Sequence, residues 1–126
     1  MAASLWDDGY RREAVQAAAT AVFDAHLPAK LGLPKGTPPR DLANAFSTDP
    51  PTATQPRLRL PGYTTGDKDW SSAHDGAKFL GFACAAGVRN LITHTVTQPD
   101  ERIALEALAA LSLFSRWADE ATVDTI

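Results

Sequence analysis

The last quarter of the chain carries apolar residues at the spacing of a helix. Steps of four and three residues separate Ile103, Ala107, Ala110, Phe114 and Trp117. The stripe is widened by Leu105, Leu108, Leu111 and Leu113. A stripe this wide is typical of a helix buried on two sides, against a neighbouring helix or a second subunit. We therefore expect a long helix from Asp100 and Glu101, two acidic residues favourable at a helix N-terminus, to about Ala121.

Residues 4–30 predict another long helix because they are rich in helix formers. Gly9 weakens its first turn, and Pro28 with Gly32 ends it. A stripe of small residues runs along it: Ala14, Ala17, Ala18, Ala21 and Ala25. This stripe either allows close approach of a partner helix or reflects only the high helix propensity of alanine.

The third long helix is expected from about Ser71 to Ile92, with Ser72 and Asp75 resembling a capping box. The bulk that we expect to face the core is Phe79, Leu80, Phe82, Ala83 and Ala86. A ridge of small residues at four-residue steps, ending at Arg89, is Ala73, Ala77, Gly81 and Ala85. Close helix packing along this ridge would bring Arg89 to a seam between helices.

Residues 47–70 cannot form a long regular element, because they contain four prolines and two glycines. We expect a mobile loop here. Within it, Arg57-Leu58-Arg59-Leu60 alternates with period two, and Pro61-Gly62 could turn the chain back into a small hairpin. Arg57 and Arg59 would then share one face and could bind substrate phosphate; the other interpretation is a solvated loop with scattered charge.

These segments predict an all-α bundle in a single domain over residues 1–126. It has three long helices, a short helix at Asp41–Phe46 and the Pro-rich insertion before the third long-helix region.

Composition narrows the function classes. Twelve Lys and Arg against 15 Asp and Glu give a net charge of −3, which opposes broad attraction to nucleic acid but leaves room for a local basic patch. Cys84 is the single cysteine, so neither an internal disulfide nor a Cys-rich metal site is expected.

The apolar stretch Ile103–Phe114 is shorter than the ~20 residues that span a bilayer, and the N-terminus does not resemble a signal peptide. We expect a soluble, cytoplasmic protein with no membrane contact.

Three histidines are candidates for proton transfer near neutral pH. His26 lies near the end of an alanine-rich helix, and His74 lies in a polar first turn where we expect solvent exposure. No two histidines have the three- or four-residue spacing that places metal ligands on one helical face, so we expect no metal and no cofactor.

His94 differs because of the residues before it, Arg89-Asn90-Leu91-Ile92-Thr93-His94. On a helix, Asn90 and His94 lie on one face and Arg89 about a third of a turn away. A guanidinium can hold a phosphate while an imidazole moves a proton, a combination suited to phosphodiester cleavage. The alternative is structural: Arg89 caps carbonyls and His94 ends the helix.

The order of these features resembles a known family. The segments that carry the resemblance are L-W-D-D-G-Y-R-R-E-A-V at 5–15, D-L-A-N-A-F-S at 41–47, L-R-L at 58–60 and R-N-L-I-T-H at 89–94. They look like the Ymh-type family of conserved bacterial proteins, grouped with the HEPN superfamily, whose ribonucleases carry Arg and His separated by four to six residues. Leu91 and Thr93 depart from the pattern common in close relatives, which is R-N-P with a small residue before His.

The resemblance implies a HEPN-like helical bundle that forms a homodimer, with the two motifs facing each other across one cleft. It implies metal-independent endoribonuclease activity on RNA, in which His94 transfers a proton, Arg89 binds the scissile phosphate and Asn90 orients them. Such domains typically serve in toxin–antitoxin and antiphage systems, beside an antitoxin or sensor protein. The alternatives are a non-catalytic HEPN-like module that binds nucleotide, RNA or a partner protein, and a purely structural dimerisation domain.

Overall fold

The computed structural model describes residues 2–88, 90 and 97–126, and within them the chain is an all-α bundle with one small two-stranded sheet. The N-terminal helices are α1 (Ala2–Asp7), α2 (Arg11–Thr20), the π-helical segment η1 (Ala21–His26) and α3 (Leu27–Leu31). The central elements are α4 (Pro39–Ala43), the 3-10 turn η2 (Asn44–Phe46), β1 (Arg57–Arg59), α5 (Lys68–Ala83) and the π-helical segment η3 (Cys84–Val88). The chain closes with α7 (Glu101–Glu120) and β2 (Thr122–Asp124).

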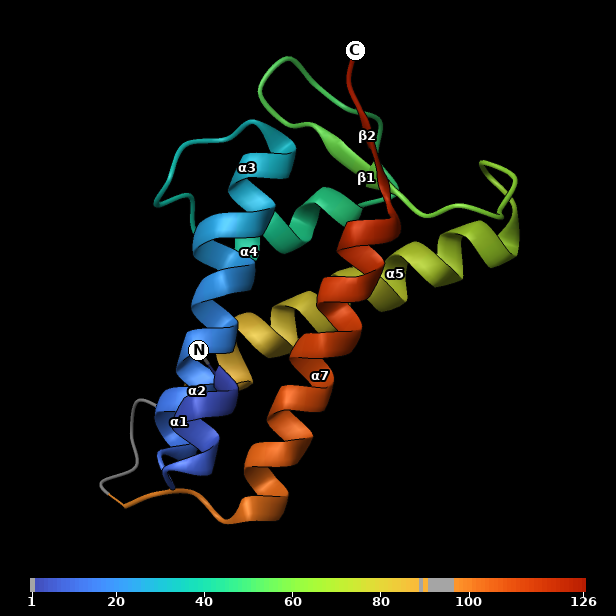
Figure 1. The fold of residues 1–126 in the computed structure, drawn as a ribbon. Helices are drawn as coiled ribbons and strands as arrows, with labels where there is room; N and C mark the ends of the chain where they lie inside the picture. Colours follow the sequence, from blue (N-terminus) through green and yellow to red (C-terminus); the bar gives the residue numbers. More distant parts are fainter. Residues whose placement is uncertain (1, 89, 91–96) are drawn as a thin grey trace.

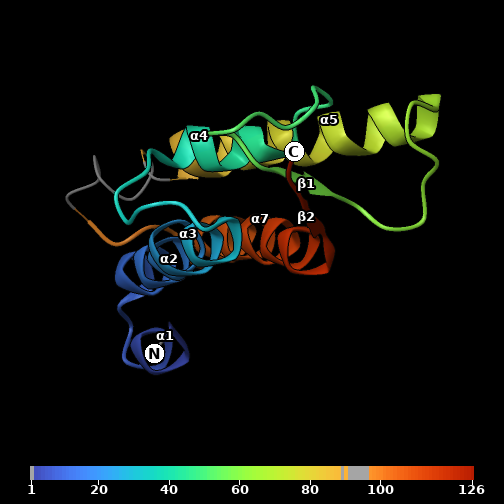
Figure 2. The ribbon, with the colours of Figure 1, turned by 90° about the horizontal axis from the view of Figure 1, so that it is seen from above.

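The helices form two layers. One layer holds α2, η1, α3 and α7, and α4 and α5 cross it as the second layer, while α1 lies outside both (Figures 1 and 2). This arrangement confirms the predicted all-α bundle. Among the described residues, no helix combines the length and apolar character needed to cross a membrane.

The predicted first long helix is broken near its start. Gly9 has φ of +85°, a left-handed conformation that glycine adopts without strain, and it ends α1 and redirects the chain into α2. From Arg11 the helical path continues through η1 and α3 to Leu31, with Gly32 as the left-handed C-terminal residue.

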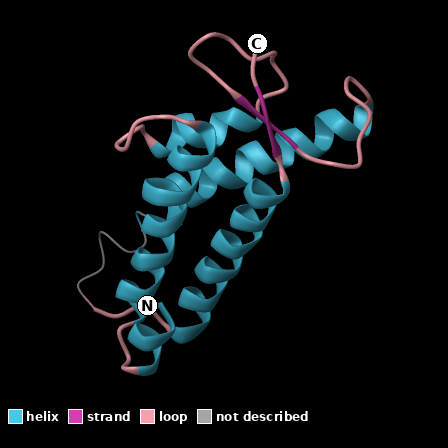
Figure 3. Cartoon of the chain, turned by 45° about the horizontal axis from the view of Figure 1, so that its top comes forward, coloured by secondary structure: helices cyan, strands magenta, loops and turns pink. Residues whose placement is uncertain are grey.

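Neither interpretation of residues 57–63, a local hairpin or a solvated loop, matches the structure, because Arg57 and Leu58 are buried and the strand pairs elsewhere. Strand β1 pairs with β2 at the C-terminal end of the described chain (Figure 3). The pairing is antiparallel, with Leu58 opposite Val123. Pairing with a distant strand buries Leu58 completely, which a two-stranded hairpin at the surface would not do. The short helix is confirmed, as α4 followed by η2.

The prediction for α5 is wrong in its start and in part of its core-facing side, although Leu80 and Phe82 pack partly buried against the core as predicted. The helix begins at Lys68 rather than near Ser72. Its buried residues are Trp70 and His74 near the start and the small Ala77 and Gly81 at the crossing with α4. The bulky Phe79 is instead 58% exposed, because the close crossing of α5 with α4 and α7 leaves no room for a ring. In α7 the predicted bounds are confirmed, and Asp100 caps the helix by accepting a hydrogen bond from the Arg102 backbone N–H at 2.9 Å.

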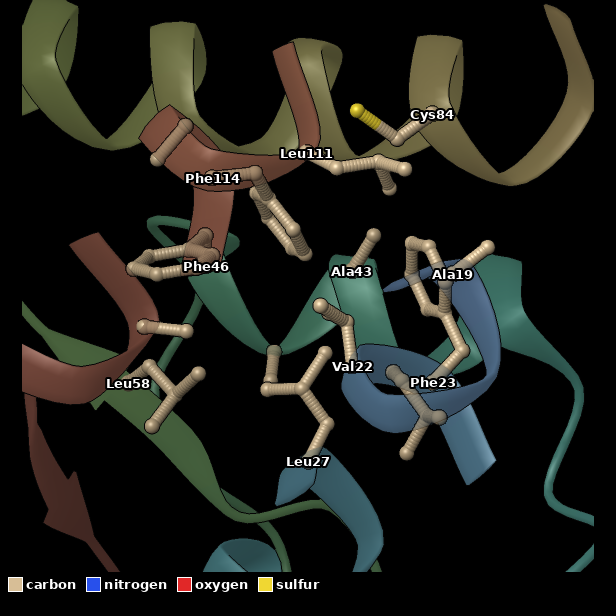
Figure 4. Packing of buried hydrophobic residues seen from close by; sticks show 14 of the residues in the cluster. Ala19, Val22, Phe23, Leu27, Ala43, Phe46, Leu58, Cys84, Leu111 and Phe114 are labelled. Atoms are coloured by element: carbon tan, nitrogen blue, oxygen red, sulfur yellow. The ribbon is translucent and has the colours of Figure 1, made fainter. Parts of the chain in front are cut away.

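Phe114 lies at the centre of the core (Figure 4). Its ring stacks on Phe23 from η1 at a centroid distance of 5.7 Å and meets the edge of Phe46 from η2 at 5.9 Å. Gly81 of α5 comes so close that an added Cβ would lie 2.6 Å from the Ala43 Cβ and 2.7 Å from the Phe114 ring. The core therefore holds α4, α5 and α7 against one another. The η3 segment follows α5 without a break and contacts α4 and α7 as well.

Candidate functional site

The Arg-Asn-x-x-x-His motif follows η3. Arg89 and His94 lie outside the described residues, and Asn90 is helical and exposed. The structure therefore describes the two flanks of the motif, and these flanks are the basis of the site.

The upstream flank is η3, a π-helical continuation of α5 that packs against α4 and α7. Cys84 anchors it, fully buried in the core, and burial raises the pKa of its thiol to about 11. Val88, the last residue of η3, packs half-buried against the same core. A π-helical turn changes the direction in which the following residues project and is frequent at functional sites.

The downstream flank is fastened to the start of α2. The Gln98 side chain accepts a hydrogen bond from the Arg12 backbone N–H at 2.8 Å and donates one to Glu13 Oε2 at 2.8 Å. The Arg11 Nε donates to the Pro99 carbonyl at 2.8 Å. One glutamine therefore replaces the side-chain cap that α2 lacks at Tyr10. We call the group of Arg11, Arg12, Glu13, Gln98 and Pro99 the α2 clamp.

The α2 clamp carries mixed charge. The hydrogen bond from Gln98 is the largest cause that lowers the pKa of Glu13, and Arg12, 3.1 Å away, lowers it further. Arg11 adds a second guanidinium, and the N-terminus of α2 adds the partial positive charge of a helix start. The downstream flank thus combines one carboxylate with two cations.

The two arginines predicted to bind substrate are engaged within the chain. Arg57 is buried, and its guanidinium donates to the Asn44 carbonyl at 3.1 Å and the Pro50 carbonyl at 3.4 Å. Arg59 donates to the carbonyls of Ser47 and Asp49 at 2.6 and 2.7 Å. Both side chains therefore tie residues 44–50 to β1.

Arg59 is also held from its other sides. Its guanidinium lies 5.2 Å from the centre of the Trp70 ring and 3.6 Å from the Asp124 carboxylate on β2. Burial is the largest cause that lowers the pKa of Arg59, and the Asp124 charge opposes this shift. These contacts place Arg59 at the junction of α5 with the small sheet, away from the motif flanks.

The predicted exposure of His74 is wrong, because this side chain is fully buried. Its Nε2 accepts a hydrogen bond from the Leu60 backbone N–H at 3.0 Å, and its Nδ1 lies 2.7 Å from the Trp70 carbonyl. Both contacts are satisfied by the neutral tautomer that carries its proton on Nδ1. Desolvation is the largest cause that lowers the pKa of His74, and the charge on Arg59 contributes.

His26 is exposed and lines a cavity of about 210 Å³ between η1 and α7, together with Lys30, Ser115 and Asp119. The Lys30 ammonium there donates to the Asp119 carbonyl at 2.8 Å. In the part of the chain that the structure describes, no group of three or more His, Cys, Asp or Glu side chains could hold a metal ion.

Sequence reasoning missed the α2 clamp. Its two halves are more than 80 residues apart, and neither half has a spacing that points to the other. The one available signal was Tyr10 before Arg11, a helix start with no Ser, Thr, Asp or Asn to cap it.

The fold and flanks define a helical bundle with an Arg-Asn-x-x-x-His segment between a π-helical turn and a clamped helix start. Residues 1–118 match the model of a family described as "Protein of unknown function (Hypoth_ymh)". The chain belongs to this Ymh family. No curated protein and no solved structure matches it.

Proposed function

We propose that this chain is a HEPN-type, metal-independent endoribonuclease that acts as a homodimer. The observation that carries the proposal is the sequence Arg89-Asn90-x-x-x-His94, at the end of an apolar helix in an all-α chain of the Ymh family. The biological setting that fits is toxin–antitoxin or antiphage defence in the cytoplasm.

The motif supplies the groups that RNA cleavage needs. The Arg89 guanidinium would hold the scissile phosphate with two hydrogen bonds and stabilise its developing charge. The His94 imidazole would move a proton between the ribose 2′-oxygen and the leaving 5′-oxygen, and Asn90 would orient these groups. Because the 2′-hydroxyl is the nucleophile, the products carry a cyclic phosphate and DNA is inert.

The described residues on both sides of the motif are held by the bundle. Cys84 and Val88 hold the chain before it in the core, and the α2 clamp holds the chain after it. Catalytic groups work best when their supporting structure limits their movement. Val88 and Gln98, described residues on either side of the motif, are held in this way.

Exposed apolar residues near the start of α7 support a second subunit. Ile103 is 40% exposed and Leu105 50% exposed, in the first two turns of the helix that follows the α2 clamp. Residues two apart on a helix project to different sides, so these two side chains are separate apolar positions and not one patch. A second subunit that packs on either side of α7 would cover one of them.

A second candidate function is a non-catalytic module that binds RNA, nucleotide or a partner protein. The observation that favours it is the engagement of Arg57 and Arg59 with carbonyls of the chain. These two cations are occupied in the fold, which leaves less positive charge to attract RNA to a chain of net charge −3.

The first prediction tests catalysis with labelled single-stranded RNA in EDTA. The parent should cleave it and leave cyclic phosphate ends, and His94→Ala and Arg89→Ala should each lower the rate by ~100-fold or more, because proton transfer and phosphate binding each contribute at least that factor. The rate is measured from product bands on a denaturing gel.

Matched controls are His26→Ala and Arg116→Ala, which remove an exposed imidazole and an exposed guanidinium away from the motif flanks. Both should cleave like the parent. Equal cleavage by all variants indicates a contaminating nuclease and contradicts the proposal. RNA binding by the parent without cleavage favours the non-catalytic module.

A further inference from the structure

Two aromatic rings and two cations form a continuous strip across α4 and α5. The Arg40 guanidinium lies 4.7 Å from the centre of the Phe82 ring, and Phe82 meets Phe79 edge-to-face at 6.2 Å. The Lys78 ammonium lies 4.9 Å from the centre of the Phe79 ring. We call Arg40, Lys78, Phe79 and Phe82 the aromatic–cationic strip.

Core packing does not account for this strip. The buried side of α5 is made by other residues, among them Ala77 and Gly81, whereas Phe79 is 58% exposed. Phe82 is half-buried against the core and fixes the base of the strip, while Phe79 projects beyond it. An exposed ring that contacts a cation and a second ring gives a stacking surface at little cost in conformational entropy.

The chemistry of the strip matches single-stranded nucleic acid. Proteins that bind single strands combine aromatic rings, on which bases stack, with cations that contact phosphates. If a second copy of this chain docked on the strip with its own strip, the two cations of each copy would repel those of the other. Asp75, 3.9 Å from Lys78, is the one carboxylate that pairs with the strip among the described residues, so the strip keeps a net positive charge.

The strip leads to the motif. Helix α5 continues from Phe82 through η3 to Val88, about 9 Å of helix rise, and the next residue is Arg89. Helix α4, which carries Arg40, packs against η3 as well as α5. The strip therefore lies along the described helical path that ends one residue before Arg89.

We propose that the aromatic–cationic strip binds bases and phosphates of single-stranded RNA next to the scissile bond. The inference rests on the proposed function for its choice of RNA. Phe79 stacks on a base, and Lys78 and Arg40 contact phosphates on either side of it.

The second prediction tests this inference by fluorescence anisotropy with a labelled single-stranded RNA. All proteins carry His94→Ala, so that the RNA stays intact during the titration. Phe79→Ala should weaken binding ~10-fold, the typical loss for one stacked base, whereas Phe79→Trp should retain it. Lys78→Gln and Arg40→Gln should each reduce the slope of log affinity against log salt by ~0.7, the value for one phosphate contact on a single strand.

The matched controls are Tyr63→Ala, which removes an aromatic ring of similar exposure on the loop after β1, and Arg116→Gln on α7. Both should bind RNA like the parent. Equal binding by the Phe79→Ala protein, or no RNA binding by any protein, overturns the inference. A Phe79→Ala protein that becomes monomeric in light scattering would make the strip a subunit interface and also overturn it.

The two proposals fail separately. If the parent binds RNA through Phe79 but does not cleave it, RNA binding by the strip is supported and the endoribonuclease proposal is wrong. If the parent cleaves RNA through His94 while Phe79→Ala changes neither affinity nor rate, the endoribonuclease proposal is supported and RNA binding by the strip is contradicted.

Discussion

His74 joins the loop after β1 to α5 through one side chain. Its imidazole is fully buried, accepts from the Leu60 N–H and donates to the Trp70 carbonyl. A proton added to Nε2 would remove the acceptor and place a buried charge that Arg59 repels and Asp75 attracts. The folded state therefore requires the neutral form of this residue.

The third prediction concerns the pH dependence of stability. Because the pKa of His74 is lowered in the folded state, the unfolded state binds the proton more readily. The full contribution of His74 to stability should be present above the unfolded pKa of about 6.5 and be lost as the pH falls below it, at no more than ~1.4 kcal/mol per pH unit. Urea unfolding between about pH 7.5 and pH 5.5 measures this slope.

The matched variant His74→Leu should flatten that slope. It should also lower the free energy of unfolding at pH 7.5 by ~1–3 kcal/mol, because the Leu60 N–H loses its acceptor. His26→Gln, at an exposed position, should change it by no more than ~0.5 kcal/mol. Identical slopes for the parent and His74→Leu would contradict the assignment.

His74 and Arg57 also show why residue-scale prediction was incomplete. Polar residues in polar segments predict exposure, yet both side chains are buried. Their partners are backbone groups of other segments, Leu60 for His74 and Asn44 for Arg57. Burial of a polar side chain depends on such partners, and one sequence does not give their positions.

At the scale of elements, the periodicity of α5 predicted a helix but did not show which face is buried. Both the bulky set with Phe79 and the small set with Gly81 repeat at helical spacing. The small set faces the core because α4 and α7 come within contact of the helix backbone at Gly81. In α7 the bounds were predicted correctly, and Ala107, Leu111 and Phe114 are buried as expected. Ile103, predicted at the start of the buried stripe, is instead exposed, and Ala104 takes its place in the core.

The fourth prediction tests the close crossing at Gly81. Gly81→Ala should lower the free energy of unfolding by ~2 kcal/mol or more, because its Cβ would lie 2.6 Å from the Ala43 Cβ and must displace α4 or the Phe114 ring. Urea denaturation followed by circular dichroism measures the change.

Gly76→Ala is the matched control in the same helix. Apart from its own stretch of helix, no atom of the described chain lies within 4 Å of its added Cβ, so the higher helix propensity of alanine should raise the free energy of unfolding by ~0.5–1 kcal/mol. Equal effects of the two substitutions would show that helix propensity, and not the crossing, decides the role of Gly81.

At the scale of the whole molecule, the two layers and the α2 clamp bring both ends of the motif segment to fixed structure. One end leaves the α4–α5 layer at η3, and the other returns at Gln98 to the layer of α2 and α7 (Figure 2). The motif itself could be found from the sequence, since its residues are neighbours. The clamp could not, because it joins segments more than 80 residues apart.

The fifth prediction gives Gln98 a positioning role in RNA cleavage. Gln98→Ala removes two hydrogen bonds to α2 and should lower the free energy of unfolding by ~1–2 kcal/mol. It should lower kcat more than it raises KM, because the loosened segment misplaces His94 without removing a phosphate contact. Cleavage kinetics on single-stranded RNA, under conditions where the variant is fully folded, measure both constants.

Two further variants separate positioning from stability. Gln16→Ala, which removes an exposed glutamine elsewhere on α2, should leave both kcat and stability unchanged. Gln98→Glu alone should lower kcat and stability as Gln98→Ala does. It places a second carboxylate beside Glu13, whose pKa is already lowered, so both carboxylates would be charged and repel each other. Adding Glu13→Gln exchanges the carboxylate and amide partners, restores the hydrogen bond and should recover kcat. If the exchange restores stability but not kcat, the clamp stabilises the fold without positioning the motif.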